Sequence, residues 1–137
     1  MLDNKIPGVG NLRVLLVEDD MFAQRLAASV LRQLGVKYLT IVKDGRAAIE
    51  LLGETELQFD LVISDWNMPH VTGLDLLKHV RKTWENMPFL MLTGNANEEF
   101  VIAARQNKVD AYVIKPFSAG QLQQKLAVMF NIKLPGQ

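Results

Sequence analysis

Hydrophobic residues along this chain follow two alternating spacings. Short, almost wholly apolar runs recur five times, and each is bounded by turn-forming or charged residues. Runs of this kind are typical of strands buried on both faces of a sheet. Between them, apolar residues recur every three or four positions, which predicts amphipathic helices. The five predicted strands lie at 12–17, 38–42, 60–64, 89–92 and 110–114.

The helical stretches have clear beginnings and ends. Asp20 is placed to cap the first helix, and Gly35 is placed to end it. Within that helix Phe22, Leu26 and Val30 mark the apolar stripe. The other four helices are predicted at 44–53, 76–84, 97–108 and 118–130.

Five strands that alternate with five helices predict an α/β fold, with a parallel sheet covered by helices on both faces. Parallel connections cross over, so every strand ends at the same edge of the sheet, where ligands bind in such folds. A chain of 137 residues fits one domain, which we expect at 12–132. A flexible leader at 1–11 and a short tail at 133–137 are expected to flank it.

Composition excludes several classes of function. Fifteen basic and fifteen acidic residues give a formal net charge of zero, so no overall field attracts nucleic acid or a membrane surface. Cysteine is absent, which excludes disulfides and thiolate metal sites. No apolar stretch is long enough to span a bilayer, and the first residues lack the features of a signal peptide. We therefore expect a cytoplasmic protein. We also expect it to be a monomer or a weak dimer.

Polar residues of complementary chemistry follow four of the strands. Glu18 and Asp19 follow the first, Asp65 the third, Thr93 the fourth and Lys115 the fifth. An aspartate can act as a nucleophile and accept a phosphoryl group. Such a transfer depends mainly on positioning and charge neutralisation, for which carboxylates that hold Mg²⁺, a hydroxyl and an ammonium are suited. The sequence predicts that Asp65 is the acceptor.

These residues stand in motifs that resemble the receiver domains of response regulators, and especially the single-domain, CheY-like regulators of chemotaxis. The resemblance covers about residues 12–130. Each motif is weak alone, but four in this order, each after a strand, are a strong signal. The motifs are Val17-Glu18-Asp19-Asp20, Ser64-Asp65-Trp66-Asn67-Met68-Pro69 with Gly73 after it, Thr93-Gly94, and Tyr112-Val113-Ile114-Lys115-Pro116-Phe117.

The resemblance implies a flavodoxin-like strand order of 2-1-3-4-5, for which CheY is itself a standard example. It implies that Asp65 receives its phosphoryl group from a histidine on a sensor histidine kinase or a histidine phosphotransfer protein. It also implies Mg²⁺ as the cofactor. Asp19 would bind the ion directly, Glu18 through water, and Asp65 with the backbone carbonyl of Asn67 would complete the protein ligands.

The resemblance further implies a switch. Thr93 would move towards the phosphoryl oxygen, and the ring of Tyr112 would turn inward behind it. The face formed by 97–108, 110–114 and 118–130 would then bind a downstream target, for which the flagellar motor switch is the chemotaxis example. Such a protein is no enzyme for an external substrate, since its only activities are Mg²⁺-dependent self-phosphorylation and self-dephosphorylation.

Alternative functions remain at this stage. A relay intermediate, or a receiver excised from a longer regulator with an effector domain, would carry the same motifs. An aspartyl phosphohydrolase would need a second acid two residues after its nucleophile, where this chain has Asn67. A P-loop is absent, which excludes the common NTPases. His70 and His79 lack partners at ligand spacing, so we reject a zinc site.

Overall fold

The computed structural model describes residues 4–54, 56 and 58–136, and it contains one five-stranded sheet. All neighbouring strands pair in parallel, in the order β2-β1-β3-β4-β5, so the predicted fold class and strand order are confirmed. No helix within the described ranges is long and apolar enough to cross a bilayer. The strands are β1 (Arg13–Val17), β2 (Tyr38–Val42), β3 (Leu61–Ser64), β4 (Phe89–Thr93) and β5 (Ala111–Ile114).

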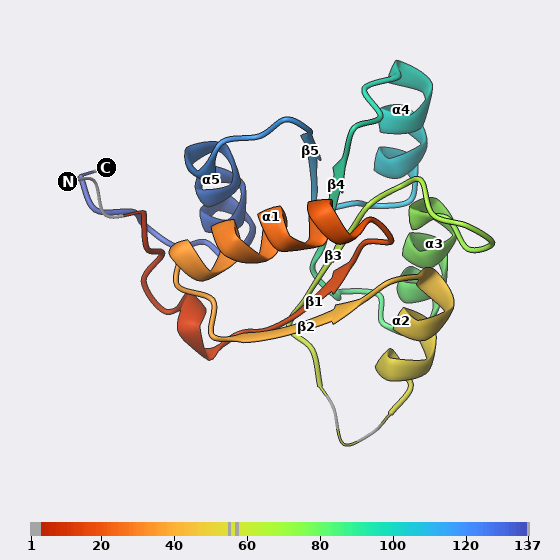
Figure 1. The fold of residues 1–137 in the computed structure, drawn as a ribbon, viewed down its shortest axis with the longest axis horizontal. Helices are drawn as coiled ribbons and strands as arrows, with labels where there is room; N and C mark the ends of the chain where they lie inside the picture. Colours follow the sequence, from red (N-terminus) through yellow and green to blue (C-terminus); the bar gives the residue numbers. More distant parts are fainter. Residues whose placement is uncertain (1–3, 55, 57, 137) are drawn as a thin grey trace.

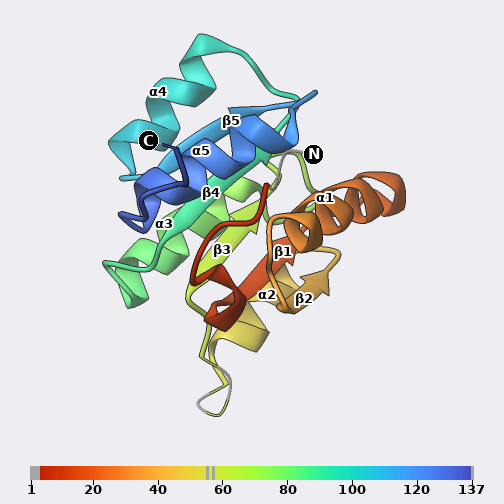
Figure 2. The same ribbon diagram turned by 90° about the vertical axis from the view of Figure 1, so that its left-hand side faces the viewer.

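Helices cover both faces of the sheet, as Figures 1 and 2 show. Two helices lie on one face and three lie on the other. A short 3₁₀ helix, η1 (Val9–Asn11), precedes β1. The first face carries α1 (Met21–Gln33) and α5 (Ala119–Met129), and the second carries α2 (Gly45–Leu52), α3 (Gly73–Thr83) and α4 (Glu98–Gln106).

Successive strand residues point to opposite faces of the sheet, and this divides the core into two clusters. In β1, Val14 and Leu16 pack with α1 and α5, whereas Leu15 and Val17 pack on the other side. Every residue of β3 and β4 is buried, which explains why these segments are continuously apolar instead of alternating. The strand β2 lies at the edge of the sheet and is more exposed.

The described part of the predicted leader, residues 4–11, contacts the domain through two apolar side chains. Ile6 and Val9 are buried in the cluster beneath α1 and α5, and the backbone N–H of Ile6 donates to the carbonyl of Leu34. Ile6 and Val9 thus anchor this segment to the domain, whereas residues 1–3 of the predicted leader lie outside the described residues. The physical reason is that two apolar side chains, separated by the turn at Gly8, gain burial in a gap at the end of α1.

Capping residues set the helix starts that border the sheet edge. The side chain of Asp20 accepts from the N–H of Ala23, so the predicted cap of α1 is confirmed. Helix α3 begins at Gly73, three residues before the predicted start. Thr72 and Asp75 form a reciprocal capping box there, and it satisfies N–H groups that the apolar spacing alone does not reveal.

Candidate functional site

Three carboxylates meet at the carboxyl edge of the sheet. One oxygen from each of Glu18, Asp19 and Asp65 lies within 4.8 Å of the others. Glu18 and Asp19 directly follow β1, and Asp65 directly follows β3. The pairing of Val17 with Ser64 brings these two strand ends into register. The acidic pair and the predicted acceptor are therefore together, as the strand order requires.

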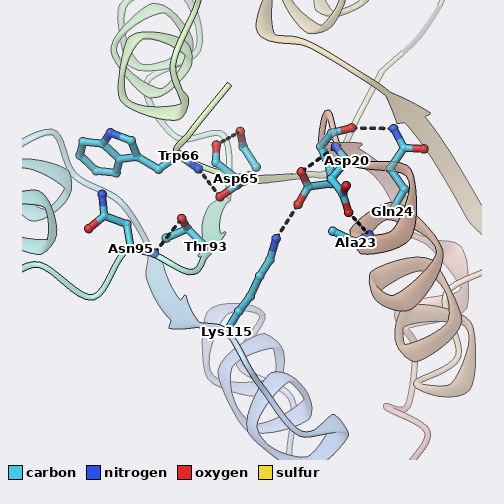
Figure 3. Close-up of polar contacts among 10 residues, drawn as sticks. Asp20, Ala23, Gln24, Asp65, Trp66, Thr93, Asn95 and Lys115 are labelled. Atoms are coloured by element: carbon cyan, nitrogen blue, oxygen red, sulfur yellow. Dashed lines mark hydrogen bonds and ion pairs between the residues drawn. The ribbon is translucent and has the colours of Figure 1, made fainter. Parts of the chain in front are cut away.

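Lys115 reaches this cluster from the end of β5, as Figure 3 shows, and it forms an ion pair with Glu18. The Nζ atom lies 2.5 Å from Oε1 of Glu18, and the backbone N–H of Asp20 donates to Oε2 at 3.1 Å. Burial raises the pKa of Glu18 above 4.5, although Lys115 and the N–H of Asp20 act in the opposite direction. Only 3% of Glu18 is exposed, so its charge depends on these partners.

The carboxylate of Asp65 is held by the residue that follows it. Its Oδ1 accepts from the backbone N–H of Trp66 at 2.7 Å. Its own N–H donates to the carbonyl of Val17, which continues the β1–β3 pairing up to the acceptor. Asp65 is half-buried, and Figure 3 shows it between Trp66 on one side and Lys115 on the other.

Gly73 allows the start of α3 to approach the acceptor closely. Its N–H donates to the carbonyl of Trp66 at 2.8 Å. A Cβ at position 73 would lie 2.2 Å from the backbone oxygen of Asp65 and 2.8 Å from the Cα of Trp66. Because both neighbours are backbone, neither can move without shifting Asp65 itself. Glycine is therefore required here by space.

Thr93 and Tyr112 are linked through the loop between β4 and α4. The backbone N–H of Asn95 donates to Oγ1 of Thr93 at 3.2 Å, and the hydroxyl of Tyr112 donates to the carbonyl of Asn95 at 2.8 Å. Thr93 is fully buried. Burial, with a contribution from the negative charge of Asp65, raises the pKa of Tyr112 above 10.0, so its hydroxyl remains a donor at neutral pH.

The other residues singled out from the sequence lie in segments that follow β3 and β5. Asn67 is exposed in the loop after Asp65. The Lys115–Pro116 peptide is cis, as the resemblance implied. His70 is exposed, and the ring of His79 packs against Trp84 at a centroid distance of 6.2 Å.

Sequence reasoning missed two residues that contact the site. Gln24 of α1 donates through Nε2 to the carbonyl of Glu18 at 2.6 Å. Phe100 of α4 packs edge-on against the indole of Trp66. Gln24 lies one helical turn after the Asp20 cap, which weakly indicated its contact with Glu18. Nothing local marks the second, because it joins segments 34 residues apart (100 − 66).

Comparison with known proteins agrees with this geometry. The model of the response regulator receiver domain matches residues 14–127, which include the three carboxylates, Thr93 and Lys115. The chain belongs to the response regulator receiver family. This receiver domain is 38% identical over 123 residues to the chemotaxis protein CheY-3 of Vibrio cholerae, with 88% of this chain and 93% of CheY-3 covered. It is 36% identical over 122 residues to CheY of Pseudomonas aeruginosa, with 88% and 97% covered.

Solved structures support the same conclusion. CheY4 of Vibrio cholerae superposes with a TM-score of 0.77 at 28% identity, covering 86% of this receiver domain and 98% of CheY4. The Mn²⁺-bound form of the response regulator Rcp1 superposes with a TM-score of 0.75 at 28% identity, covering 91% and 99%. The receiver domain thus has the CheY-type architecture over most of its length. The predicted acidic residues lie at the carboxyl edge of its sheet.

The acidic cluster has the chemistry of a divalent cation site. Its three carboxylates, with one ammonium, leave an excess of two negative charges when all are ionised. Oxygen ligands of this kind suit a hard cation such as Mg²⁺. Glu18 already uses both carboxylate oxygens, on Lys115 and on the N–H of Asp20, whereas Asp19 is exposed at the mouth of the cluster. This difference favours Asp19 as the direct ligand.

Proposed function

We propose that this receiver domain is a phosphorylation switch of a two-component pathway, and that Asp65 accepts the phosphoryl group from a phosphohistidine of a sensor kinase or phosphotransfer protein. The observation that carries the proposal is the meeting of Asp65 with Glu18 and Asp19 within 4.8 Å, with Lys115 paired to the same cluster. An isolated aspartate at a strand end would need none of these neighbours. Similarity to CheY proteins supports a role in chemotaxis.

Oδ2 of Asp65 is the proposed nucleophile, because Oδ1 is held by the N–H of Trp66. The bond between Oδ2 and phosphorus forms as the phosphorus–nitrogen bond of the donor histidine breaks. The electron pair of the broken bond returns to the imidazole. Asp65 must be ionised to attack, and its half-buried position at the sheet edge keeps it within reach of a donor.

The other residues of the cluster handle the charge of the transferred group. Bound Mg²⁺ would supply positive charge to the phosphoryl oxygens, held by Asp19 and Asp65, with Glu18 acting through water and the carbonyl of Asn67 completing the protein ligands. Lys115 would exchange Glu18 for a phosphoryl oxygen. This exchange requires little movement of the lysine stem, because Glu18 and Asp65 belong to one cluster.

The switch is proposed to run through the β4–α4 loop. When the hydroxyl of Thr93 donates to a phosphoryl oxygen, it moves away from the N–H of Asn95. Asn95 is also tied through its carbonyl to Tyr112 on β5, so a shift of the loop reaches the neighbouring strand. In this structure the hydroxyl of Tyr112 already bonds to the loop. We therefore propose that phosphorylation moves this loop and that the ring of Tyr112 turns inward with it.

Two exposed apolar surfaces suit the two classes of partner. Met21, Phe22 and Leu26 on α1 are exposed by 64%, 78% and 54% and lie next to the acidic cluster, where the donor protein must approach. Ile102 of α4 and Ile114 of β5 are exposed by 46% and 43% on the side proposed for the downstream target, such as a flagellar motor switch. We propose that the protein works in the cytoplasm as a monomer or a weak dimer.

Transfer from a phosphorylated histidine protein tests this function. The wild-type chain, Asp65→Asn and Asp20→Asn are each mixed with the donor and Mg²⁺, and loss of label from the donor is followed. Asn also caps a helix, so Asp20→Asn removes a nearby carboxylate without disturbing α1. We expect transfer to the wild type and to Asp20→Asn but not to Asp65→Asn. Equal transfer to all three chains would contradict the proposal.

A further inference from the structure

The residue after the acceptor connects the site to helix α4. The backbone N–H of Trp66 holds Oδ1 of Asp65, and its indole is buried, with 4% exposed. Figure 3 shows this indole on the side of Asp65 away from Lys115, above Asn95. Any shift of the Asp65 carboxylate that moves the Trp66 backbone must also be accommodated by the residues around the indole.

Phe100 of α4 packs against that indole. The two ring centroids lie 4.8 Å apart with an interplanar angle of 67°, an edge-to-face arrangement. Tyr112 of β5 lies at 6.4 Å and 55°. The indole is therefore in contact with α4 and near β5, the two elements on the proposed output side.

Helix α4 makes few other buried contacts near its start. From Gly94 to Glu99 every residue is exposed except Asn95, which is half-buried. Phe100 is the first side chain of the helix that packs into the core, and Ala104 is its only fully buried residue. A helix with so little buried surface can shift or open more easily than its neighbours. Figure 1 shows α4 standing at the end of the molecule beyond α3.

We propose that Phe100 is a positioning residue that couples the state of Asp65 to the placement of helix α4, through its edge-to-face contact with Trp66. The inference rests on the proposed phosphorylation of Asp65 and adds a second route beside the one through Thr93 and Tyr112. The Thr93 route moves the loop before α4, whereas the Trp66 route acts on the first core-facing residue of the helix itself.

The test compares hydrogen exchange of residues 94–106 before and after modification of the intact chain with acetyl phosphate and Mg²⁺. The variants are Phe100→Leu, which keeps apolar volume but removes the ring, and Phe100→Tyr, which keeps an aromatic ring whose edge can face the indole of Trp66. Phe130→Leu is the matched control, since Phe130 is also half-buried but packs in the cluster on the opposite face of the sheet. The extent of modification at Asp65 is measured by mass in every sample.

We expect equal modification in all four chains. The change in exchange of residues 94–106 should be at least about threefold smaller in Phe100→Leu than in wild type, and Phe100→Tyr and Phe130→Leu should behave as wild type. A full response in Phe100→Leu overturns the inference while the proposed function stands. Absence of modification in the wild type overturns both. If Phe100→Leu does not fold, Phe100→Met takes its place and is judged by the same outcomes.

Fluorescence of Trp66 supplies a second readout that a purely structural role would not move. Trp84 is replaced by Phe in all chains so that the emission reports Trp66 alone. Modification should shift the Trp66 emission in the Trp84→Phe chain, and Phe100→Leu in the same background should reduce that shift. An unreduced shift contradicts a role for Phe100 at the indole.

Discussion

Lys115 and Glu18 form an ion pair at 2.5 Å across the carboxyl ends of β5 and β1, and this pair sets the resting charge of the site. Glu18 is almost fully buried, while the side chain of Lys115 is 24% exposed. Burial raises the pKa of the Glu18 carboxyl, and the Lys115 ammonium acts against this effect by stabilising the charged form. The ammonium is thus held ready at the place where the phosphoryl group is proposed to form.

Lys115→Ala should leave Asp65 able to accept a phosphoryl group but should weaken the conformational response. The variant removes the cation proposed to pair with the phosphoryl oxygen, whereas the nucleophile and the acids remain. The measurement is hydrogen exchange across α4 and β5 at matched levels of modification. A variant that cannot be modified, or one that responds as fully as wild type, would contradict this role.

Asp19→Asn should chiefly weaken the binding of Mg²⁺. Asp19 is the exposed member of the three-carboxylate cluster and is not occupied by Lys115, so it is the proposed direct ligand. We expect a loss of at least about tenfold in affinity, or ~1.4 kcal/mol. Asp20→Asn is the matched control. Titration followed by Trp66 emission checks both, and similar losses in the two variants would reject the assignment.

The raised pKa of Glu18 predicts a dependence of stability on pH. The folded chain binds this proton more tightly than the unfolded chain, because burial disfavours the carboxylate. The stabilising contribution is therefore complete below 4.5 and is lost as the pH rises through the folded pKa. In Glu18→Gln this loss should be absent.

Urea unfolding of both chains from about pH 4 to about pH 8 measures the difference. Mg²⁺ should offset the loss in the wild type, because the cation favours the charged form of Glu18. Identical pH profiles for wild type and Glu18→Gln, with and without Mg²⁺, would show that this carboxyl does not titrate as described.

Gly73→Ala should destabilise the chain by about 3 kcal/mol, because its Cβ would meet backbone atoms of Asp65 and Trp66. The control is Gly120→Ala in the first turn of α5, where the nearest atom lies 3.9 Å from the added Cβ. That change should stabilise by about 0.5 kcal/mol. Urea midpoints measure both. A neutral Gly73→Ala would mean that the acceptor backbone is not held against α3.

Much of the fold could be predicted because the physical signals were local. The continuous apolar run before Asp65 predicted a strand ending at 64, and β3 ends at Ser64. Asp20 was predicted as a cap from its place before an apolar stripe, and its carboxylate caps α1. Because the strands were predicted to run in parallel, the topology predicted that Glu18, Asp19 and Asp65 would meet at one edge of the sheet.

The remaining features depend on contacts that the sequence does not encode locally. Pro7, Gly8 and Gly10 made residues 1–11 look irregular, yet Ile6 and Val9 fill a gap that only the folded domain creates. The choice of Glu18 as partner of Lys115 depends on side-chain reach at the strand ends.

The most direct test of the central claim is to map the modified residue after treatment with acetyl phosphate and Mg²⁺. Reduction of the acyl phosphate marks the residue, and peptide mass spectrometry locates it. We expect one modified residue, Asp65, with the mark lost in Asp65→Asn and kept in Asp20→Asn. A mark on another residue, undiminished in Asp65→Asn, would contradict it.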